Sequence, residues 1–186
     1  RYILTDGQGN AWWAALEKVD AKRCVGRLLH DEELPHLSSE LPAEVTCAVG
    51  IIRPTRFEHL LAGLVQLGTA RTIPLNCRYS DPGHVKRYSA GEYHGRLEKI
   101  NLSGMKNSLR TVLPELSFPM DMEELAHQKW DLVIFGDPDG LPYIHTKEPP
   151  DGRRILLATG PEGGFSHREI ELLRDMGGIP LSLGRT

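Results

Sequence analysis

The pattern of hydrophobic and polar positions changes near residue 44. Before it, short apolar and aromatic runs such as "RYILTDG" and "AWWAALEKV" are separated by glycine and charged residues, which predicts a small β meander, part of a barrel. An acidic, proline-containing stretch, "HDEELPHLSSELPAE", follows as a linker. Beyond it, continuous apolar runs alternate with amphipathic segments. The pattern therefore predicts an α/β domain over residues 44–186 behind a partial β domain over residues 1–43.

The α/β part contains apolar runs of strand length and segments with helical periodicity. Strands are predicted over residues 45–52, 72–75, 130–136, 154–159 and 179–183. Helices are predicted over residues 55–68, 92–109 and 121–128. Thr55 with Glu58, and Asp121 with Glu124, have the spacing of a capping box at a helix start. Runs without alternation, such as "WDLVIFG" and "RILLAT", indicate parallel strands that are covered on both faces.

The composition is typical of a globular chain. Of the 186 residues, 40% are hydrophobic, which suffices for a core, and no apolar run is long enough to span a bilayer. Cys24, Cys47 and Cys77 show no C-x-x-C spacing, which argues against a zinc site or a disulfide framework. We therefore expect no bound metal, no membrane association and a cytoplasmic location. The first residue is not Met, so we also expect the natural protein to begin earlier.

The charge is unevenly distributed along the chain. The formal net charge is −3, which by itself argues against a nucleic-acid partner. Between residues 71 and 110, however, eight basic residues stand against three acidic ones, a local balance of +5. The basic residues are Arg71, Arg78, Lys86, Arg87, Arg96, Lys99, Lys106 and Arg110. This segment is a candidate surface for a polyanion, and an ordinary solvated surface is the alternative.

The stretch "LATGPEGGFSHREIELL", residues 157–173, places a glycine-rich turn between an apolar strand and a helix. Ser166 with Glu169 has capping-box spacing, and Phe165 with Ile170 has hydrophobic-staple spacing. Turns at the carboxyl ends of parallel strands are where α/β proteins bind ligands. The turn lacks a P-loop lysine and G-x-G-x-x-G spacing, and Glu162 would repel phosphate. It suits a neutral or cationic ligand such as an adenosine that carries a sulfonium; a tight turn that needs glycine is the alternative.

The segment "LLATGPEGGFSHREIELLRDMGGIPLSLG" resembles the signature of the RsmE family. These are S-adenosylmethionine-dependent methyltransferases that modify N3 of a uridine in 16S ribosomal RNA, and they belong to the SPOUT superfamily of trefoil-knotted α/β enzymes. Upstream, "RLEKINLSGMKNSLRTVLPEL" resembles a helix of that family, and "DGQGNAWWAALEKVDAKRC" resembles its PUA-like barrel. The resemblance implies a SPOUT-type knotted parallel-sheet domain, preceded by a partial PUA-like β-barrel that binds RNA.

The resemblance also implies functional residues. It places the S-adenosylmethionine site on Phe135, Gly136, Gly160, Pro161, Glu162, Gly163, Gly164, Leu181, Ser182, Leu183 and Gly184. Uridine N3 carries a proton at neutral pH, so methylation requires that proton to leave and the resulting anion to be stabilised. Arg110 is the candidate cation and Asn107 the candidate for orienting the base; a helix C-terminal role is the alternative for Arg110. RNA contacts are expected at Arg71, Arg78, Lys86, Arg87 and Arg96.

Several positions depart from the family pattern. The first amphipathic helix has Gly63 and Gln66 where the family carries a lysine and a glutamate, and Asn107 stands where the family has a glutamine. Tyr79 stands where an arginine is common, although Arg78 is adjacent. The sequence ends at "LGRT", where the family continues with the segment that completes the knot. We therefore expect an incomplete knot, a structure without S-adenosylmethionine, and an open cofactor pocket. The family's homodimer is also expected. The alternatives are a SPOUT enzyme for another RNA and an RNA-binding relative with weakened catalysis.

Overall fold

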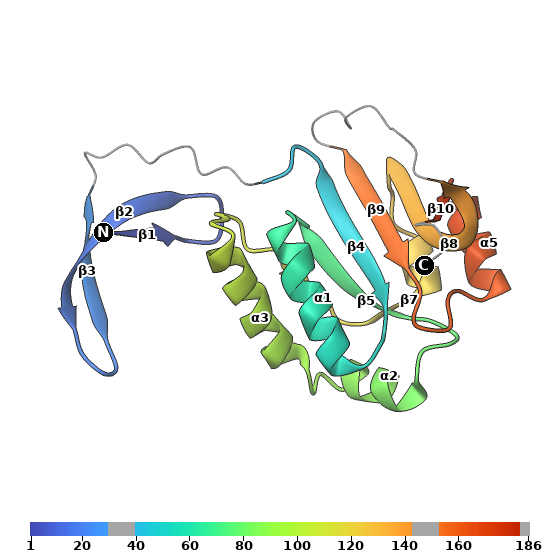
Figure 1. The fold of residues 1–186 in the computed structure, drawn as a ribbon, viewed down its shortest axis with the longest axis horizontal. Coiled ribbons are helices and arrows are strands. Elements are labelled where there is room, and N and C mark those ends of the chain that lie inside the picture. Colours follow the sequence, from blue (N-terminus) through green and yellow to red (C-terminus); the bar gives the residue numbers. More distant parts are fainter. Residues whose placement is uncertain (30–39, 143–152, 183–186) are drawn as a thin grey trace.

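The computed structural model describes residues 1–29, 40–142 and 153–182, which form two sheets (Figure 1). The smaller sheet is antiparallel, in the order β1-β2-β3. Its strands are β1 (Tyr2–Thr5), β2 (Ala11–Val19) and β3 (Cys24–Leu29). The β meander predicted from the alternating pattern is therefore confirmed. The linker predicted after it falls mainly outside the described residues.

The larger sheet is parallel, and its order is β10-β8-β9-β4-β5-β6, with β7 also paired to β5. Its strands are β4 (Glu44–Gly50), β5 (Arg71–Asn76), β6 (Glu115–Leu116), β7 (Met120–Asp121), β8 (Leu132–Pro142), β9 (Arg154–Thr159) and β10 (Ile179–Ser182). Each predicted strand is present. β6 and β7 were not predicted, because two residues are too few to show a periodic pattern.

The helices are α1 (Pro54–Gln66), α2 (Pro82–Ser89), α3 (His94–Asn107), α4 (Met122–Ala126) and α5 (His167–Asp175). Capping boxes open α4 and α5 as predicted. The capping box predicted at Thr55 and Glu58 is wrong: α1 begins one residue earlier, at Pro54, and has no side-chain cap. The ring of Pro54 fixes φ for the first turn and removes one N–H that would need a cap. Glu58 instead pairs with Arg96 at 2.7 Å.

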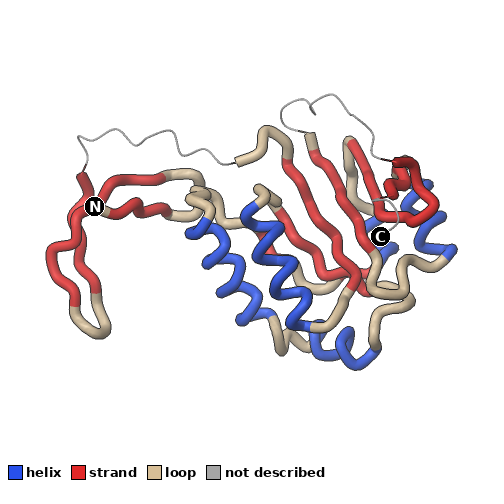
Figure 2. The backbone as a smooth tube through the Cα atoms, viewed as in Figure 1, coloured by secondary structure: helices blue, strands red, loops and turns tan. Residues whose placement is uncertain are grey.

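Two hydrophobic cores lie on opposite faces of the parallel sheet. Successive side chains of a strand point to opposite faces, so Cys47 and Val49 of β4 pack with α1, α2 and α3, while Ala48 packs with α4 and α5. Phe57 and Leu61 fill the first core and are fully buried. The tube view shows the resulting arrangement of helices beside a central sheet (Figure 2). This explains why the strand sequences are apolar runs without alternation.

The small sheet contacts the α/β domain through the turn between β1 and β2. Gln8 forms an isolated bridge with Val112, and Leu113 N donates to Gly7 O at 2.8 Å. The amide of Gly9 and the hydroxyl of Thr5 both donate to Thr111 O, each at 3.0 Å. The segment after α3 therefore holds the hairpin turn by backbone pairing.

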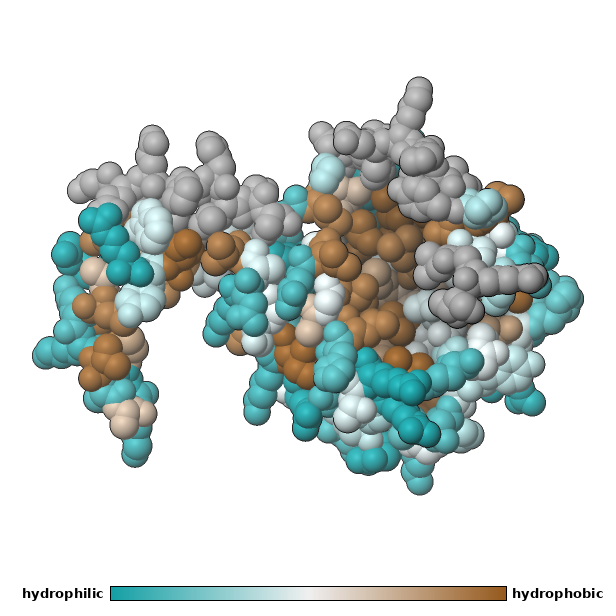
Figure 3. All heavy atoms as spheres, viewed as in Figure 1, coloured by the Kyte–Doolittle hydropathy of each residue, from teal (hydrophilic) through white to brown (hydrophobic). Residues whose placement is uncertain are grey.

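Part of the parallel sheet lies open to solvent. Hydrophobic side chains gather over β4 and β9 in the space-filling view (Figure 3). Leu157 of β9 is 38% exposed, and Leu141 of β8 is 52% exposed. Among the described residues, no helix combines the length and the hydrophobicity that crossing a membrane would need.

Candidate functional site

The loops predicted to bind the cofactor follow three neighbouring strands. β8 lies between β9 and β10, and the three strands are parallel, so their carboxyl ends lie side by side along one edge of the sheet. The pairing of β8 with β10 jumps from Phe135 opposite Pro180 to Leu141 opposite Leu181, which leaves residues 136–140 to arch out of the ladder. Ser182 Oγ donates to the carbonyl of Pro138 in this arch, at 3.1 Å. The structure therefore brings the predicted residues of β8 and β10 together.

The turn at residues 160–164 closes tightly on itself and on the end of β4. Gly164 N donates to Pro161 O at 2.8 Å, and Gly164 has a φ of 72°. A Cβ on Gly160 would come within 2.7 Å of the Gly164 carbonyl carbon, and one on Gly50 within 2.3 Å of Pro161 N. Glycine is therefore required by the backbone of the turn itself, and this holds whether or not the turn binds a ligand.

Glu162, the acidic residue in this turn, lies against α1. Its carboxylate pairs with the guanidinium of Arg56 at 3.3 Å, and both side chains are at least half exposed. An exposed pair of this kind contributes about 0–1 kcal/mol to stability. The pair directs the carboxylate toward α1, beside a small hollow that also includes Arg53 and His84.

Glu169 joins the start of α5 to the loop after β5. Its buried carboxylate accepts hydrogen bonds from Ser166 N and Arg78 N at 2.7 Å each, and from Ser166 Oγ at 2.8 Å. Burial and the charge of Glu169 together raise the pKa of the Cys77 thiol to about 12. The sequence predicted Glu169 only as a helix cap. Its hydrogen bond to Arg78 joins residues 91 positions apart, and no sequence pattern near either residue predicts it.

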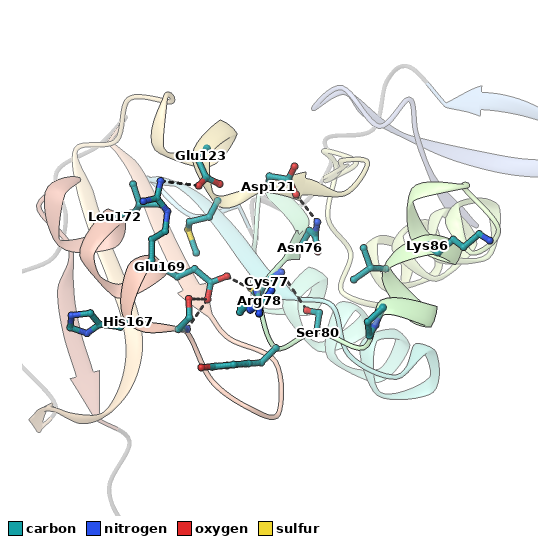
Figure 4. Close-up of a pocket in the computed structure, with 16 residues that line it drawn as sticks. Asn76, Cys77, Arg78, Ser80, Lys86, Asp121, Glu123, His167, Glu169 and Leu172 are labelled. Atoms are coloured by element: carbon teal, nitrogen blue, oxygen red, sulfur yellow. Dashed lines mark hydrogen bonds and ion pairs between the residues drawn. The ribbon is translucent and has the colours of Figure 1, made fainter.

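An open cleft of about 810 Å³ lies at the carboxyl end of β5, beside the glycine turn (Figure 4). It is bounded by the loop after β5 and by the starts of α2, α4 and α5. Its lining includes Asn76, Arg78, Tyr79, Lys86, Asp121, Glu123, Arg168 and Glu169. The predicted cofactor residues do not line this cleft, which is therefore a separate feature of the same edge.

The basic residues predicted to contact RNA do not form one surface. Arg71 lies at the amino end of β5, where it pairs with Glu115 at 3.0 Å and bonds Ser117 and Gln128. Arg87 pairs with Glu92 and lies over the ring of Tyr93, and Arg96 pairs with Glu58. Arg78 and Lys86 line the cleft. The local charge balance identified basic residues, but their folded positions place only these two at the cleft.

The predicted catalytic residues lie at the opposite edge of the sheet, where the parallel strands begin. Arg110 is 3% exposed, and its Nη1 donates to Val65 O at 2.9 Å and to Thr69 O at 2.7 Å, just before β5 begins. Its Nε and Nη2 donate to the carboxylate of Glu40. Asn107, at the end of α3, is exposed. Within one chain, neither residue is brought to the glycine turn.

Some predictions fall outside the part of the chain that the structure describes. Leu183 and Gly184, predicted to bind the cofactor, and the sequence end belong to this group. In the described part, no three His, Cys, Asp or Glu side chains are grouped closely enough to hold a metal ion.

Comparison with known proteins identifies the family. A family described as RNA methyltransferase domain matches residues 39–186. The chain is 27% identical over 190 residues to a ribosomal RNA small subunit methyltransferase E from Synechocystis, covering 99% of this chain and 59% of that protein. For the protein of the same name from Bacillus subtilis, identity is 24% over 154 residues, covering 78% of this chain and 60% of that protein. The chain thus spans about 60% of the length of these curated relatives.

Solved structures have the same architecture. A methyltransferase from Legionella pneumophila with bound S-adenosylmethionine matches with a TM-score of 0.84 and 27% identity, over 99% of this chain and 74% of that one. A ribosomal RNA small subunit methyltransferase E from Neisseria gonorrhoeae, also bound to S-adenosylmethionine, has a TM-score of 0.83 and 21% identity, with the same coverage. The predicted α/β fold with a small preceding sheet is confirmed. The chain belongs to the RNA methyltransferase domain family and is a distant homologue of the RsmE methyltransferases.

Proposed function

We propose that this chain is the S-adenosylmethionine-binding part of a methyltransferase that modifies N3 of a uridine in 16S ribosomal RNA. The observation that carries the proposal is the meeting of three loops, at Gly136, Gly160–Gly164 and Leu181–Ser182, on adjacent strands of one sheet edge. Supporting it are the names of the curated relatives and the cofactor in the Legionella structure. The residue assignments and the SPOUT knot come from the resemblance and are part of the proposal.

The residues at this edge suit a cofactor that backbone groups hold. Gly136 is exposed, and a Cβ built on it would meet other atoms only at 3.9 Å or beyond, so a ligand has room against its backbone. The arch at residues 136–140 leaves the regular ladder with β10, and we propose that its backbone groups contact the ligand. When bound there, S-adenosylmethionine supplies the methyl group. The chain's own contribution is to hold and orient the donor with these loops.

The same reaction needs RNA and a cation near uridine N3. Because Arg110 lies at the opposite edge of its own sheet, a catalytic role for it would require the site of a second copy. We propose a homodimer, and the exposed apolar side chain of Leu157 on the open sheet face is consistent with one. The N-terminal part, residues 1–43, which includes the small sheet β1–β3, is proposed to bind RNA. The exact RNA and nucleotide belong to the proposal rather than to the family assignment.

A second candidate is an RNA-binding relative without catalysis. The buried contacts of Arg110 favour it, since a guanidinium that is fully engaged by Glu40 and two carbonyls is not free to stabilise a uridine anion. In this candidate the fold and the RNA contacts are retained, while methyl transfer is lost.

The test is cofactor binding by Gly136→Val, measured by calorimetry, together with methylation of 16S ribosomal RNA detected by mass spectrometry. The valine side chain would occupy the space proposed for the cofactor, so we expect loss of binding with an unchanged unfolding temperature. Gly95→Val is the matched control, because a Cβ at Gly95 meets no atom within 4 Å, so the side chain has room there too, but Gly95 lies on α3. Unchanged affinity in Gly136→Val contradicts the site. Absence of binding by the unmodified protein favours the second candidate.

A further inference from the structure

Tyr79 is a large exposed aromatic residue beside the glycine turn. It lies in the loop between β5 and α2, lines the cleft, and is 56% exposed. A Cβ on Gly163 would come within 2.9 Å of Tyr79 Cβ and 3.4 Å of Tyr79 Cγ, so Tyr79 packs directly on the turn. An arginine is common at this position in the family pattern, so the aromatic ring is a departure of this chain from that pattern. The cofactor site does not account for it.

The loop that carries Tyr79 is held on both sides. Arg78 N is bonded to the Glu169 carboxylate, and Ser80 N donates to Cys77 O at 3.0 Å. Asp81 then caps α2 by accepting from His84 N. A side chain on a fixed backbone loses little conformational entropy when it binds a flat partner, so the ring is a prepared surface for stacking.

The charges around the cleft leave a cation available. Each acidic side chain of the lining already has a donor: Asp121 accepts from Asn76 at 2.6 Å, Glu123 pairs with Arg168 at 3.5 Å, and Glu169 accepts three hydrogen bonds. Arg78 is exposed, and among the described residues its guanidinium has no ion-pair partner. In the close-up, Arg78 lies centrally between Glu169 and Ser80 (Figure 4). A guanidinium in this position suits a phosphate.

We propose that this cleft receives the nucleotide that is to be methylated, with its base stacked on Tyr79 and its phosphate bound by Arg78. Aromatic faces and arginine side chains are the groups that hold splayed-out bases of single-stranded RNA. The volume of about 810 Å³ is within the range of small-molecule sites and accommodates one nucleotide with solvent. The contact of Tyr79 with Gly163 places the base beside the proposed cofactor loop. The proposal rests on the proposed function for its substrate class.

The experiment compares two short ligands and four variants, one of which is a control. The ligands are a uridine pentanucleotide and a ribose-phosphate pentamer that lacks bases, and binding is measured by calorimetry or NMR titration. Tyr79→Ala is expected to weaken uridine binding about five-fold to about 150-fold, the range for losing one stacked base, and to leave the base-free ligand unaffected. Tyr79→Phe keeps a ring and should bind both ligands as the unmodified protein does. Arg78→Met should weaken both ligands and lower the salt-dependence slope by about one unit.

Phe118→Ala is the matched control, because Phe118 is also an exposed aromatic, 60% exposed, but stacks on His94 outside the cleft lining. It should not change the preference for bases. The proposal is overturned if Tyr79→Ala keeps the full preference for the uridine ligand, if it weakens both ligands equally, or if the unmodified protein shows no preference. Calorimetry with S-adenosylmethionine on Tyr79→Ala separates the two proposals: lost uridine preference with intact cofactor binding supports the nucleotide site. If the unmodified protein prefers the uridine ligand, and Tyr79→Ala removes that preference, but the protein does not bind S-adenosylmethionine, the proposed methyl-transfer function is overturned and the nucleotide site is retained.

Discussion

Replacing Arg110 by methionine tests whether this residue supports the fold or the chemistry. The guanidinium side chain is 1% exposed, and it bonds the Glu40 carboxylate and the carbonyls of Val65 and Thr69. Removing one partner of a buried ion pair costs about 3–5 kcal/mol, because the other charge is left uncompensated. The Glu40 side chain is 23% exposed and regains part of its hydration, which favours the lower end, about 3 kcal/mol.

That loss is large compared with a typical total stability of about 5–15 kcal/mol. Urea-induced unfolding followed by circular dichroism would measure it for Arg110→Met, for Glu40→Gln and for the double variant. Since the two side chains contact each other, the double variant should be less destabilised than the sum of the single ones, by at least about 1 kcal/mol. A free energy of unfolding within about 1 kcal/mol of the unmodified protein would refute the structural reasoning. Lost methylation at unchanged stability would instead identify Arg110 as catalytic.

The further predictions concern Cys77 and two glycines, Gly164 and Gly63. Cys77 should resist iodoacetamide at pH 8 in the folded protein, as followed by mass spectrometry, while the exposed Cys24 reacts. The pKa of Cys77 is about 12 in the folded protein against an ordinary 9.0, so between these pH values the native thiol keeps a proton that the unfolded chain loses. The free energy of unfolding should therefore be unaffected by Cys77 below pH 9 and should fall between pH 9 and pH 12. Urea midpoints that stay constant from pH 9 to pH 12 would contradict this. Gly164→Ala should lower the unfolding free energy by about 1 kcal/mol, because φ at Gly164 is 72°, whereas Gly63→Ala on α1 should raise it slightly.

The secondary structure could be predicted where the sequence carries periodic information. The apolar runs of β4 and β9 and the capping boxes of α4 and α5 are local signals, and they were interpreted correctly. α2 was not predicted because "PGHVKRYS" has no apolar stripe; its stability comes from Tyr88, which is buried under α1 and α3.

The proposed functional edge was predictable only in part. The resemblance named residues on three loops, and strand adjacency explains why these meet, but neither showed the cleft beside them. Arg110 illustrates the limit: its main partner, Glu40, is 70 positions earlier in the chain, and an ion pair across that separation leaves no periodic pattern. The burial of a charged residue is a property of the folded core, and here it contradicts the exposure that arginine usually has.

The three hydrogen bonds of Glu169 restrict which substitutions the sequence can accept during evolution. One carboxylate begins α5 and also fixes the loop that carries Arg78 and Tyr79. Aspartate would be one methylene too short to reach both partners, and glutamine would present an amide donor to groups that are themselves donors. Replacing Glu169 would therefore disturb both the start of α5 and the loop after β5. Position 169 is coupled to the cleft, and we expect tolerated replacements there to appear only together with changes in the loop after β5.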